Sequence, residues 1–283
     1  MKIIPFQALA CPLDGEPLRR EGAVWRCAAE HSFDVASQGY VHLLPVQNKR
    51  SRDPGDSKEM VAARRRFLNA GPYQPIAEAV SRAALADSAP TATLSCLDAG
   101  CGEGYYLRQL AAAAAEGPTL ALLGLDISKW AVLSAAKQDK RLAWVVGSNA
   151  NLPVLPGTLD RLLCMFGFPV YAEFARVLKP GGLLLKVDAG PDHLRELREI
   201  IYPSLKPERP LDSPTPEGFT ELDGETVRYR LELTSPEQIA DLLTMTPHLY
   251  RTSAEGRARA ERLTALSLTV DVRLTRFRRK EHP

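Results

Sequence analysis

Short apolar runs alternate with amphipathic helical patterns along the chain after about residue 90. The runs of strand length lie at 93–98, 120–125, 142–146, 159–165 and 183–187. The segments with apolar residues at helical spacing lie at 103–115, 129–138 and 170–178. This alternation predicts a parallel sheet with helices on both faces, and two later strands, 226–233 and 267–276, bring the total to seven. We therefore predict an α/β fold with a Rossmann-like, seven-stranded sheet.

The first 90 residues follow a different pattern. Residues 1–47 combine short apolar runs with turns and are too few to build a large core. Residues 48–57 are polar and contain a Pro-Gly turn, which indicates a linker. Two helices follow it, and Asp56 or Ser57 is expected to cap the first of them. The predicted organisation is a small module at 1–47, a basic linker with a helix pair at 48–90, and a sheet domain at 91–283.

The first strand of the sheet domain leads into a glycine-rich turn. The segment Asp98-Ala-Gly-Cys-Gly-Glu-Gly104 has glycine at positions 100, 102 and 104, so the backbone can turn tightly and approach a ligand closely. The second strand ends in Asp126, whose carboxylate can accept hydrogen bonds from both hydroxyls of a ribose. The spacing of the three glycines is shorter than in the dinucleotide pattern G-x-G-x-x-G, and it favours S-adenosylmethionine as the cofactor. The alternative is a doubly wound domain whose glycine turn serves packing alone.

Further candidates for this site follow the other strands. Asp98 is expected to lie at the methionine end of the cofactor, together with Gly100 and Gly102. Alternatively, Asp98 is a buried acid that caps the loop. Ser148 and Asn149 are placed to contact the adenine edge, although Ser-Asn is also ordinary turn chemistry. Phe166 and Phe168 follow the fourth strand and either stack on a flipped base or pack against the next helix.

Charge points to local rather than global contacts with nucleic acid. The formal net charge is +2 over 283 residues, so the chain is not a polycation. Two basic clusters flank the linker and predict a phosphate-binding surface: Lys49, Arg50 and Arg52, then Arg64, Arg65 and Arg66. A third basic cluster lies at 276–280. Each of them could also be simply a solvated face.

The cysteines and the apolar runs suggest the compartment. There are five cysteines, an odd number, and three of them lie inside the sheet domain, which argues against a disulfide framework. We find neither a signal-peptide pattern nor an apolar run of the roughly 20 residues that would span a bilayer. We therefore expect a cytoplasmic protein with reduced thiols and no membrane partner.

Beyond its fold, the sequence resembles the RlmA family, bacterial enzymes that methylate N1 of a guanine in a hairpin loop of 23S ribosomal RNA. The matching segments are 31–34, 39–41, 43–47, 49–56, 64–65, 70–75, 98–106, 175–182 and 190–194. The glycine loop is shared with many methyltransferases, whereas the N-terminal module joined to the linker Lys49-Arg-Ser-Arg-Asp-Pro-Gly-Asp56 is specific. The resemblance covers roughly the first 200 residues.

The resemblance implies a zinc-ribbon-like module on a class I methyltransferase domain, a 23S rRNA hairpin as substrate and a homodimeric state. It also adds Tyr73, Glu103 and His193, together with Gly102, to the cofactor pocket. Competing interpretations are a methyltransferase for small molecules, which would not need the N-terminal module or the basic linker, and an RNA-binding paralogue without activity. The intact glycine loop and Asp126 argue against the latter.

The N-terminal module offers a metal-ligand set with one unusual member. A structural zinc site takes four ligands, mostly sulfur and nitrogen, and this chain offers Cys11, Asp14, Cys27 and His31. The family pattern has a cysteine where Asp14 stands. Either Asp14 binds Zn²⁺ through oxygen, or the metal is lost and the module is held by its own small core.

Guanine N1 carries a proton at neutral pH, so a base must accept it. The polar candidates near strand ends are Asp160, Asp188, Asp192 and His193, and none of them is unambiguous; the resemblance implies no acid at Asp188. Cys164 lies inside an apolar strand and is expected to be a core residue rather than a nucleophile.

Overall fold

The computed structural model describes residues 2–48, 51, 53–205 and 214–281. Its main sheet has nine strands in the order β11-β12-β10-β9-β6-β7-β8-β5, and β1 pairs with β7 beside this path. The strands of this sheet are β1 (Ile3–Ile4), β5 (Tyr40–His42), β6 (Thr93–Ala99), β7 (Thr119–Asp126), β8 (Ala143–Val146), β9 (Leu159–Met165), β10 (Leu178–Ala189), β11 (Phe219–Leu233) and β12 (Leu266–Arg279).

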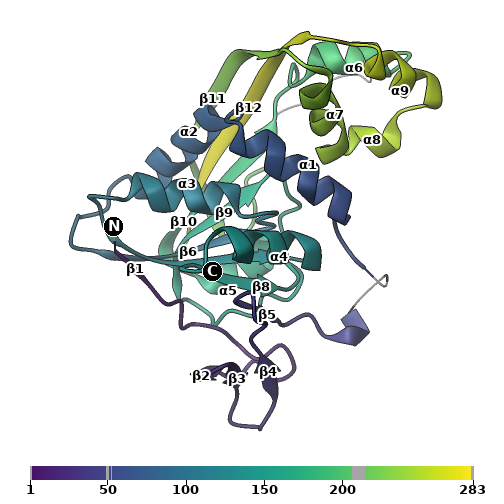
Figure 1. The fold of residues 1–283 in the computed structure, drawn as a ribbon. Helices are drawn as coiled ribbons and strands as arrows, with labels where there is room; N and C mark the ends of the chain where they lie inside the picture. The colour runs from purple at the N-terminus through teal and green to yellow at the C-terminus, as the bar shows by residue number, and fades with distance from the viewer. Residues whose placement is uncertain (1, 49–50, 52, 206–213, 282–283) are drawn as a thin grey trace.

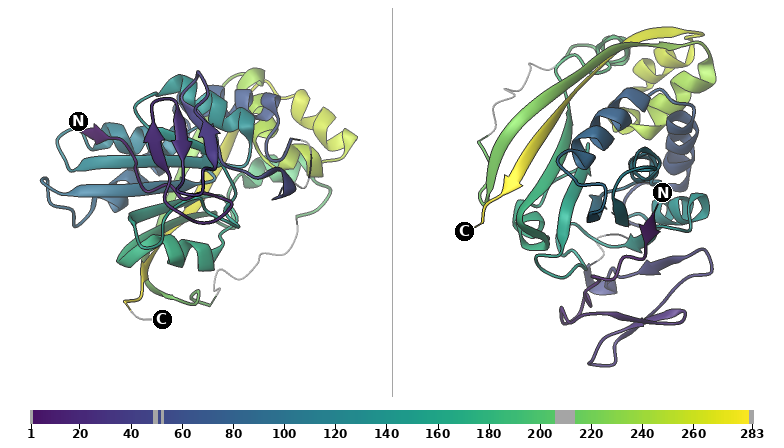
Figure 2. Two further views of the ribbon diagram at one scale, coloured as in Figure 1. Left: turned by 90° about the horizontal axis from the view of Figure 1, so that it is seen from below. Right: turned by 90° about the vertical axis from the view of Figure 1, so that its left-hand side faces the viewer.

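All seven predicted strands are present, and the sheet is of the predicted mixed α/β type. The central strands β6 to β10 pair in parallel, whereas β12 pairs antiparallel with both β10 and β11. The long β11–β12 hairpin closes one edge of the sheet, and Figure 2 shows it curving away from the central strands.

The sheet is larger than predicted because the N-terminal segment contributes two short strands. β1 pairs in parallel with β7 through Ile3 and Leu120, and β5 pairs in parallel with β8 through Tyr40 and Trp144. The rest of the module forms a separate three-stranded sheet of β2 (Arg19–Glu21), β3 (Val24–Arg26) and β4 (Ser32–Asp34). The module is therefore joined to the main sheet by backbone pairing, and Figure 1 shows it at the bottom of the molecule.

Nine helices of the described chain and one 3₁₀ turn surround the sheet. They are η1 (Val46–Asn48), α1 (Lys58–Asn69), α2 (Gln74–Leu85), α3 (Tyr105–Ala113), α4 (Lys129–Gln138), α5 (Tyr171–Val177), α6 (Arg195–Ile201), α7 (Pro236–Met245), α8 (His248–Arg251) and α9 (Ala254–Glu261). Ser57, Ser128 and Ser235 cap α1, α4 and α7, each accepting a hydrogen bond from a backbone N–H of the first turn. Ser57 is one of the two residues that the sequence predicted as the cap of α1.

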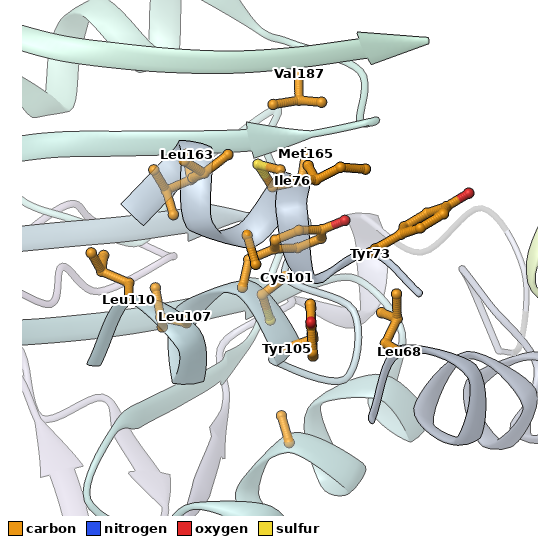
Figure 3. Close-up of a cluster of buried hydrophobic side chains, with 14 of the residues drawn as sticks. Leu68, Tyr73, Ile76, Cys101, Tyr105, Leu107, Leu110, Leu163, Met165 and Val187 are labelled. Carbon is orange, nitrogen blue, oxygen red and sulfur yellow. The ribbon is translucent and has the colours of Figure 1, made fainter. Parts of the chain in front are cut away.

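Two hydrophobic clusters lie on the opposite faces of the sheet. The larger one packs α1 to α4, α6, α7 and α9 against one face, and Figure 3 shows part of it between α2, α3 and the central strands. The smaller cluster packs α5 and the N-terminal module against the other face. The carboxyl ends of the parallel strands are thereby left between these layers as the natural place for a ligand.

Two further predictions concern cysteines and membranes. All five cysteines are buried and free, and Cys164 is a core residue as expected. No helix within the described ranges has the length and apolar character needed to cross a membrane.

Candidate cofactor site and metal cluster

The glycine turn after β6 has the geometry that the sequence predicted. Gly100, Gly102 and Gly104 have φ angles of +92°, +55° and +83°, which only glycine adopts readily. A Cβ on Gly104 would also collide with the ring of Trp144 beneath the turn. Asp126 fixes the turn from β7, because its Oδ2 accepts a hydrogen bond from the Gly102 N–H at 2.9 Å.

Asp126 therefore has a structural duty in addition to its predicted ribose contact. Its Oδ1 accepts from the Ser128 N–H at 2.8 Å, so each oxygen already holds one backbone donor and keeps a further lone pair for a ligand. Burial raises the pKa of the Asp126 carboxyl although both backbone hydrogen bonds lower it.

Asp98 is the most unusual polar side chain of this region. It is 0 % exposed, and neither carboxylate oxygen has a hydrogen-bond partner among the described residues. Burial, followed by the negative charge of Asp126, raises the pKa of Asp98 to about 8. A buried carboxyl without a partner costs free energy, and a cationic ligand group placed beside it would remove that cost.

A second unsatisfied atom lies close by. The Asn149 side-chain amide donates to the Ala99 carbonyl at 3.5 Å, while its Oδ1 is buried and without a partner in the described parts of the chain. The Ser148 hydroxyl accepts from the Ala150 N–H at 3.2 Å, a contact within the turn after β8. The orphaned oxygens of Asp98 and Asn149 fit S-adenosylmethionine, which carries an ammonium group and an adenine amine as donors.

The side chain of Glu103 points away from this site. It is buried and forms an ion pair with Arg108 at 3.1 Å, and it accepts from the Gln138 amide at 2.5 Å. The carboxylate thus holds the start of α3 against α4. The family resemblance implies that Glu103 contacts the cofactor, and only its backbone remains for that contact.

Three aromatic rings from distant parts of the sequence meet at the carboxyl edge of the sheet. The ring of Phe166 stacks on His193 with centroids 5.9 Å apart and an interplanar angle of 26°. The ring of Tyr73, at the start of α2, lies 6.2 Å from Phe166 and 6.1 Å from His193. The structure therefore brings together Tyr73 and His193, which the resemblance implied as cofactor residues.

The protonation state of His193 follows from its two partners. Its Nδ1 accepts a hydrogen bond from the backbone N–H of Asp271 at 3.3 Å, so this nitrogen carries a lone pair. Burial, with the nearby charges of His248 and Arg198, lowers the pKa of His193 to about 4, so the ring is neutral at pH 7. Its proton consequently lies on Nε2, which faces the Tyr73 hydroxyl at 3.4 Å.

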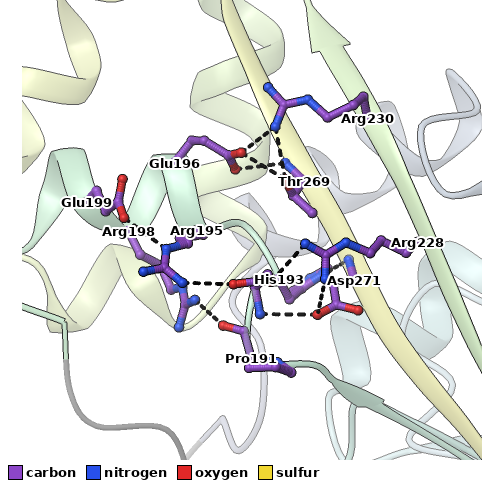
Figure 4. Close-up of polar contacts among 11 residues, drawn as sticks. Pro191, His193, Arg195, Glu196, Arg198, Glu199, Arg228, Arg230, Thr269 and Asp271 are labelled. Atoms are coloured by element: carbon purple, nitrogen blue, oxygen red, sulfur yellow. Dashed lines mark hydrogen bonds and ion pairs between the residues drawn. The ribbon is translucent and has the colours of Figure 1, made fainter.

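Asp271 also fixes the loop that carries His193 (Figure 4). Its carboxylate accepts from the Asp192 N–H at 3.1 Å, and its carbonyl accepts from the Gly190 N–H at 2.8 Å. A Cβ on Gly190 would lie 2.5 Å from Asp271 Oδ2, so this position has room only for glycine. Asp271 is buried in β12 and was not predicted; an acid within the apolar run 267–276 was the available signal.

The linker lies over the cofactor region. A Cβ on Gly55 would lie 2.9 Å from Ile127 and Ser128, and the Ser128 hydroxyl donates to the Asp56 carbonyl at 2.7 Å. Arg64 passes above Gly102, forms an ion pair with Asp56 and donates to the Met245 carbonyl at 2.8 Å. Arg64, predicted to bind RNA, is thus occupied in holding the linker and α7 over the glycine turn.

The other basic residues predicted to bind RNA differ in what can be said of them. Lys49, Arg50 and Arg52 lie outside the described residues. Arg66 is paired with Asp241. Arg65 is exposed on α1 and has no ion-pair or hydrogen-bond partner within the described ranges, so it remains available for a phosphate.

The four predicted metal ligands converge in the N-terminal module. Their ligand atoms all lie within 4.8 Å of one another. His31 Nδ1 is 2.9 Å from Asp14 Oδ2, 3.4 Å from Cys27 Sγ and 3.5 Å from Cys11 Sγ. Tetrahedral Zn²⁺ with bonds of about 2.0–2.3 Å needs ligand atoms about 3.3–3.8 Å apart. The four groups therefore converge into a ligand set of the kind that can hold a metal ion.

Comparisons with known proteins agree with both halves of this picture. The family model described as "RlmA, N-terminal" matches residues 9–52, and a methyltransferase domain model matches residues 96–182. A protein of Micromonospora griseorubida assigned as a 23S rRNA (guanine-N(1)-)-methyltransferase is 37% identical over 95% of this chain and 97% of its own length. The chain belongs to the RlmA family of methyltransferases.

Two further relatives share the assignment. The YxjB protein of Bacillus subtilis is 30% identical over 96% of this chain and 97% of its own length. The 23S rRNA (guanine(748)-N(1))-methyltransferase of Streptomyces fradiae is 36% identical over 68% of this chain and 67% of its own length. This RlmA-family protein is thus an S-adenosylmethionine-dependent methyltransferase with a zinc-ribbon module.

The structure distinguishes among the four candidates for the base in this RlmA-family protein. Asp160 lies at the amino end of β9, where it accepts from the Ser95 N–H and pairs with Lys179. Both oxygens of Asp192 are occupied by Arg195 and Arg228. His193 has no free lone pair on its ring. Asp188, which is half-exposed at the carboxyl end of β10 and paired with Lys186, is the remaining candidate.

Proposed function

We propose that the protein transfers the methyl group of S-adenosylmethionine to N1 of a guanine in a hairpin loop of 23S rRNA. The single observation that carries the reaction is Asp98, a fully buried carboxyl without a described partner beside a glycine turn. The identity of the substrate is supported by relatives of this chain that are assigned to 23S rRNA guanines.

Bound S-adenosylmethionine supplies an electrophilic methyl group: the guanine N1–C bond forms as the C–S bond breaks, and the N1 proton leaves to a base or to water. The contribution of the protein is to hold the two reactants in line and away from bulk water. Asp98 would bind the methionine ammonium group, and Asp126 the ribose hydroxyls. Tyr73 and neutral His193 would close the pocket, with Ser148 and Asn149 at the adenine edge.

We also propose that the N-terminal module binds structural Zn²⁺ through Cys11, Asp14, Cys27 and His31. The convergence of the four ligand atoms supports this. Two thiolates with one carboxylate should bind more weakly than three thiolates, so Asp14→Cys should tighten zinc binding about 10- to 100-fold, and Asp14→Ala should weaken it. Competition with a chromophoric chelator measures both; equal affinities of the wild type and Asp14→Ala would show that Asp14 is not a ligand.

The partners follow from the same proposal. Lys49, Arg50, Arg52 and Arg65 would neutralise phosphates of the hairpin, and two copies of the chain would act as a homodimer in the cytoplasm, where ribosomes are assembled. Light scattering of the purified protein, with and without a 23S rRNA fragment, tests the dimer directly.

The decisive experiment is mass spectrometry of nucleosides from unmethylated 23S rRNA incubated with the protein and S-adenosylmethionine. We expect N1-methylguanosine in one hairpin, with Asp98→Asn as the inactive control. The absence of any methylated nucleoside, with cofactor binding intact, would overturn the rRNA assignment and point to a small-molecule substrate or to an inactive protein.

A further inference from the structure

Phe168 is an aromatic side chain left in solvent at the edge of the cofactor site. Its exposed fraction is 88 %, the highest among the large hydrophobic residues of the described chain. Exposure of a whole aromatic ring forgoes the free energy of burial, and such residues commonly mark a binding surface. The following Pro169 restricts the backbone of Phe168 to extended conformations, so the ring has a limited set of positions.

The turn that carries Phe168 is pressed against the start of the glycine loop. The Phe166 N–H donates to the Val187 carbonyl at 2.9 Å, which fixes the turn at the end of β9. A Cβ on the intervening Gly167 would lie 3.7 Å from the carbonyl oxygen of Ala99, the last residue of β6. Phe168 is therefore held beside the strand end that carries Asp98 and opens into the glycine turn.

The structure separates the two phenylalanines of this turn. Phe166 has a left-handed φ of +54°, and its ring, although 40 % of the residue is exposed, is stacked on His193 and lies near Tyr73. A strained backbone at a non-glycine residue is typical of functional sites. Phe168, two residues on, has no aromatic partner among the described residues and faces solvent. The same turn thus holds one ring against His193 and Tyr73 and leaves the other ring in solvent.

We propose that the ring of Phe168 is the platform on which the target guanine stacks after leaving its own base stack in the RNA loop. The proposal rests on the rRNA methyltransferase function given above. A guanine that exposes N1 must be unpaired, and unpaired bases are commonly held by stacking on aromatic side chains. Stacking on Phe168 would place the base on the outer side of the ring cluster formed by Phe166, His193 and Tyr73.

The test compares four variants in steady-state methylation of a 23S rRNA fragment. Phe168→Ala and Phe168→Leu should lower kcat/KM for RNA about 10- to 100-fold, because Leu keeps the apolar volume but has no π face. Phe168→Tyr should retain activity. Leu222→Ala, at an exposed apolar residue of β11, is the matched control and should behave as the wild type. Calorimetry should give the same S-adenosylmethionine affinity for all of them.

Three results would overturn the proposal: full activity in Phe168→Ala, equal activity in Phe168→Leu and wild type, or a loss of cofactor affinity that accounts for the whole defect. A wild-type protein that methylates no rRNA would instead contradict the proposed function itself. A hairpin with 2-aminopurine at the methylated guanine gives an independent measure. Its fluorescence should be quenched by the wild type and brighter with Phe168→Ala.

Discussion

The polar side chains at the glycine turn and those at the β11–β12 edge of the same sheet differ in whether they have partners. In the pocket, Asp98 and Asn149 have buried oxygens without partners in the described structure. At the β11–β12 edge, Arg230 pairs with Glu196, whose carboxylate also accepts from the Thr269 N–H at 2.8 Å (Figure 4). Buried polar groups are normally satisfied within the protein, so the orphaned oxygens of Asp98 and Asn149 mark a place for the donors of a ligand.

A cluster of basic residues in the sequence does not by itself mark a surface for nucleic acid. In the third basic cluster, at 276–280, Arg276 pairs with Asp223 and Arg279 donates to the Leu178 carbonyl. Arg276 and Arg279 therefore link β12 to its neighbouring strands. The predictions below test this division, from the largest expected effect to the smallest.

The same chemical change should have different effects in the two regions. Asp98→Asn should lower S-adenosylmethionine affinity about 100-fold, because it removes the negative charge that faces the ammonium group, and should leave the fold intact. Glu196→Gln, the matched change at the edge, should lower stability by about 1–2 kcal/mol with unchanged affinity. Calorimetry and thermal unfolding separate the two effects. Similar cofactor affinities for both variants would remove the distinction.

The two regions meet at the contact between Asp271 and Gly190. Gly190→Ala should raise KM for S-adenosylmethionine about 10-fold, because its methyl group would displace the loop that carries His193. In the background of Asp271→Ala the same change should cost much less, since the obstructing carboxylate is gone. Strictly additive effects on KM would show that Asp271 does not constrain this loop. ¹⁵N spectra of His193 should show the proton on Nε2 in the wild type.

The unsatisfied carboxyl of Asp98 should also release a measurable proton when the cofactor binds. Asp98, with a pKa of about 8, is largely protonated at pH 7, and an adjacent ammonium group lowers its pKa on binding. Cofactor binding should therefore release up to about one proton at pH 7 and almost none above pH 9. Calorimetry in buffers of different ionisation enthalpy measures the release. Asp98→Asn should abolish it; persistence in that variant would assign the proton to another group.

The smallest effect concerns two arginines, of which Arg65 is exposed and Arg276 is paired. Arg65→Ala should reduce the salt dependence of RNA binding by about one phosphate contact, which corresponds to a slope change of about 0.7–1. Arg276→Ala should leave the slope unchanged, because its side chain is paired with Asp223. Combined Arg50→Ala and Arg52→Ala in the linker should reduce the slope further. Equal slopes for Arg65→Ala and Arg276→Ala would refute the placement of the RNA surface.

The sequence allowed the seven main strands and the glycine turn to be predicted because their signals are local. The period of the apolar residues and the glycine spacing are visible within about ten positions. The strands β1 and β5 have only two and three residues, and their partners lie more than 90 residues away, so no local pattern marks them. Their formation depends on the exposed edges of β7 and β8.

Side-chain partners were the least predictable part of the site. Arg64 and Arg65 are neighbours in an apparently uniform basic run, yet one is tied to Asp56 and the other is exposed. Glu103 lies within the glycine motif, but its direction is decided by Arg108 and Gln138. The direction in which a helix or loop residue faces is a property of packing, whereas the motif reports only the backbone.

The pairing of β1 and β5 with the main sheet sets an order for folding during synthesis. Ile3 and Ile4 must wait for Leu120 and Ala121, and β5 must wait for β8, before their backbone hydrogen bonds can form. The N-terminal module is therefore completed only after β8 has been synthesised. Until then the four proposed metal ligands can converge only in a module that is not yet paired with the main sheet. Binding of a metal ion at that stage would allow the module to fold before it pairs with the main sheet.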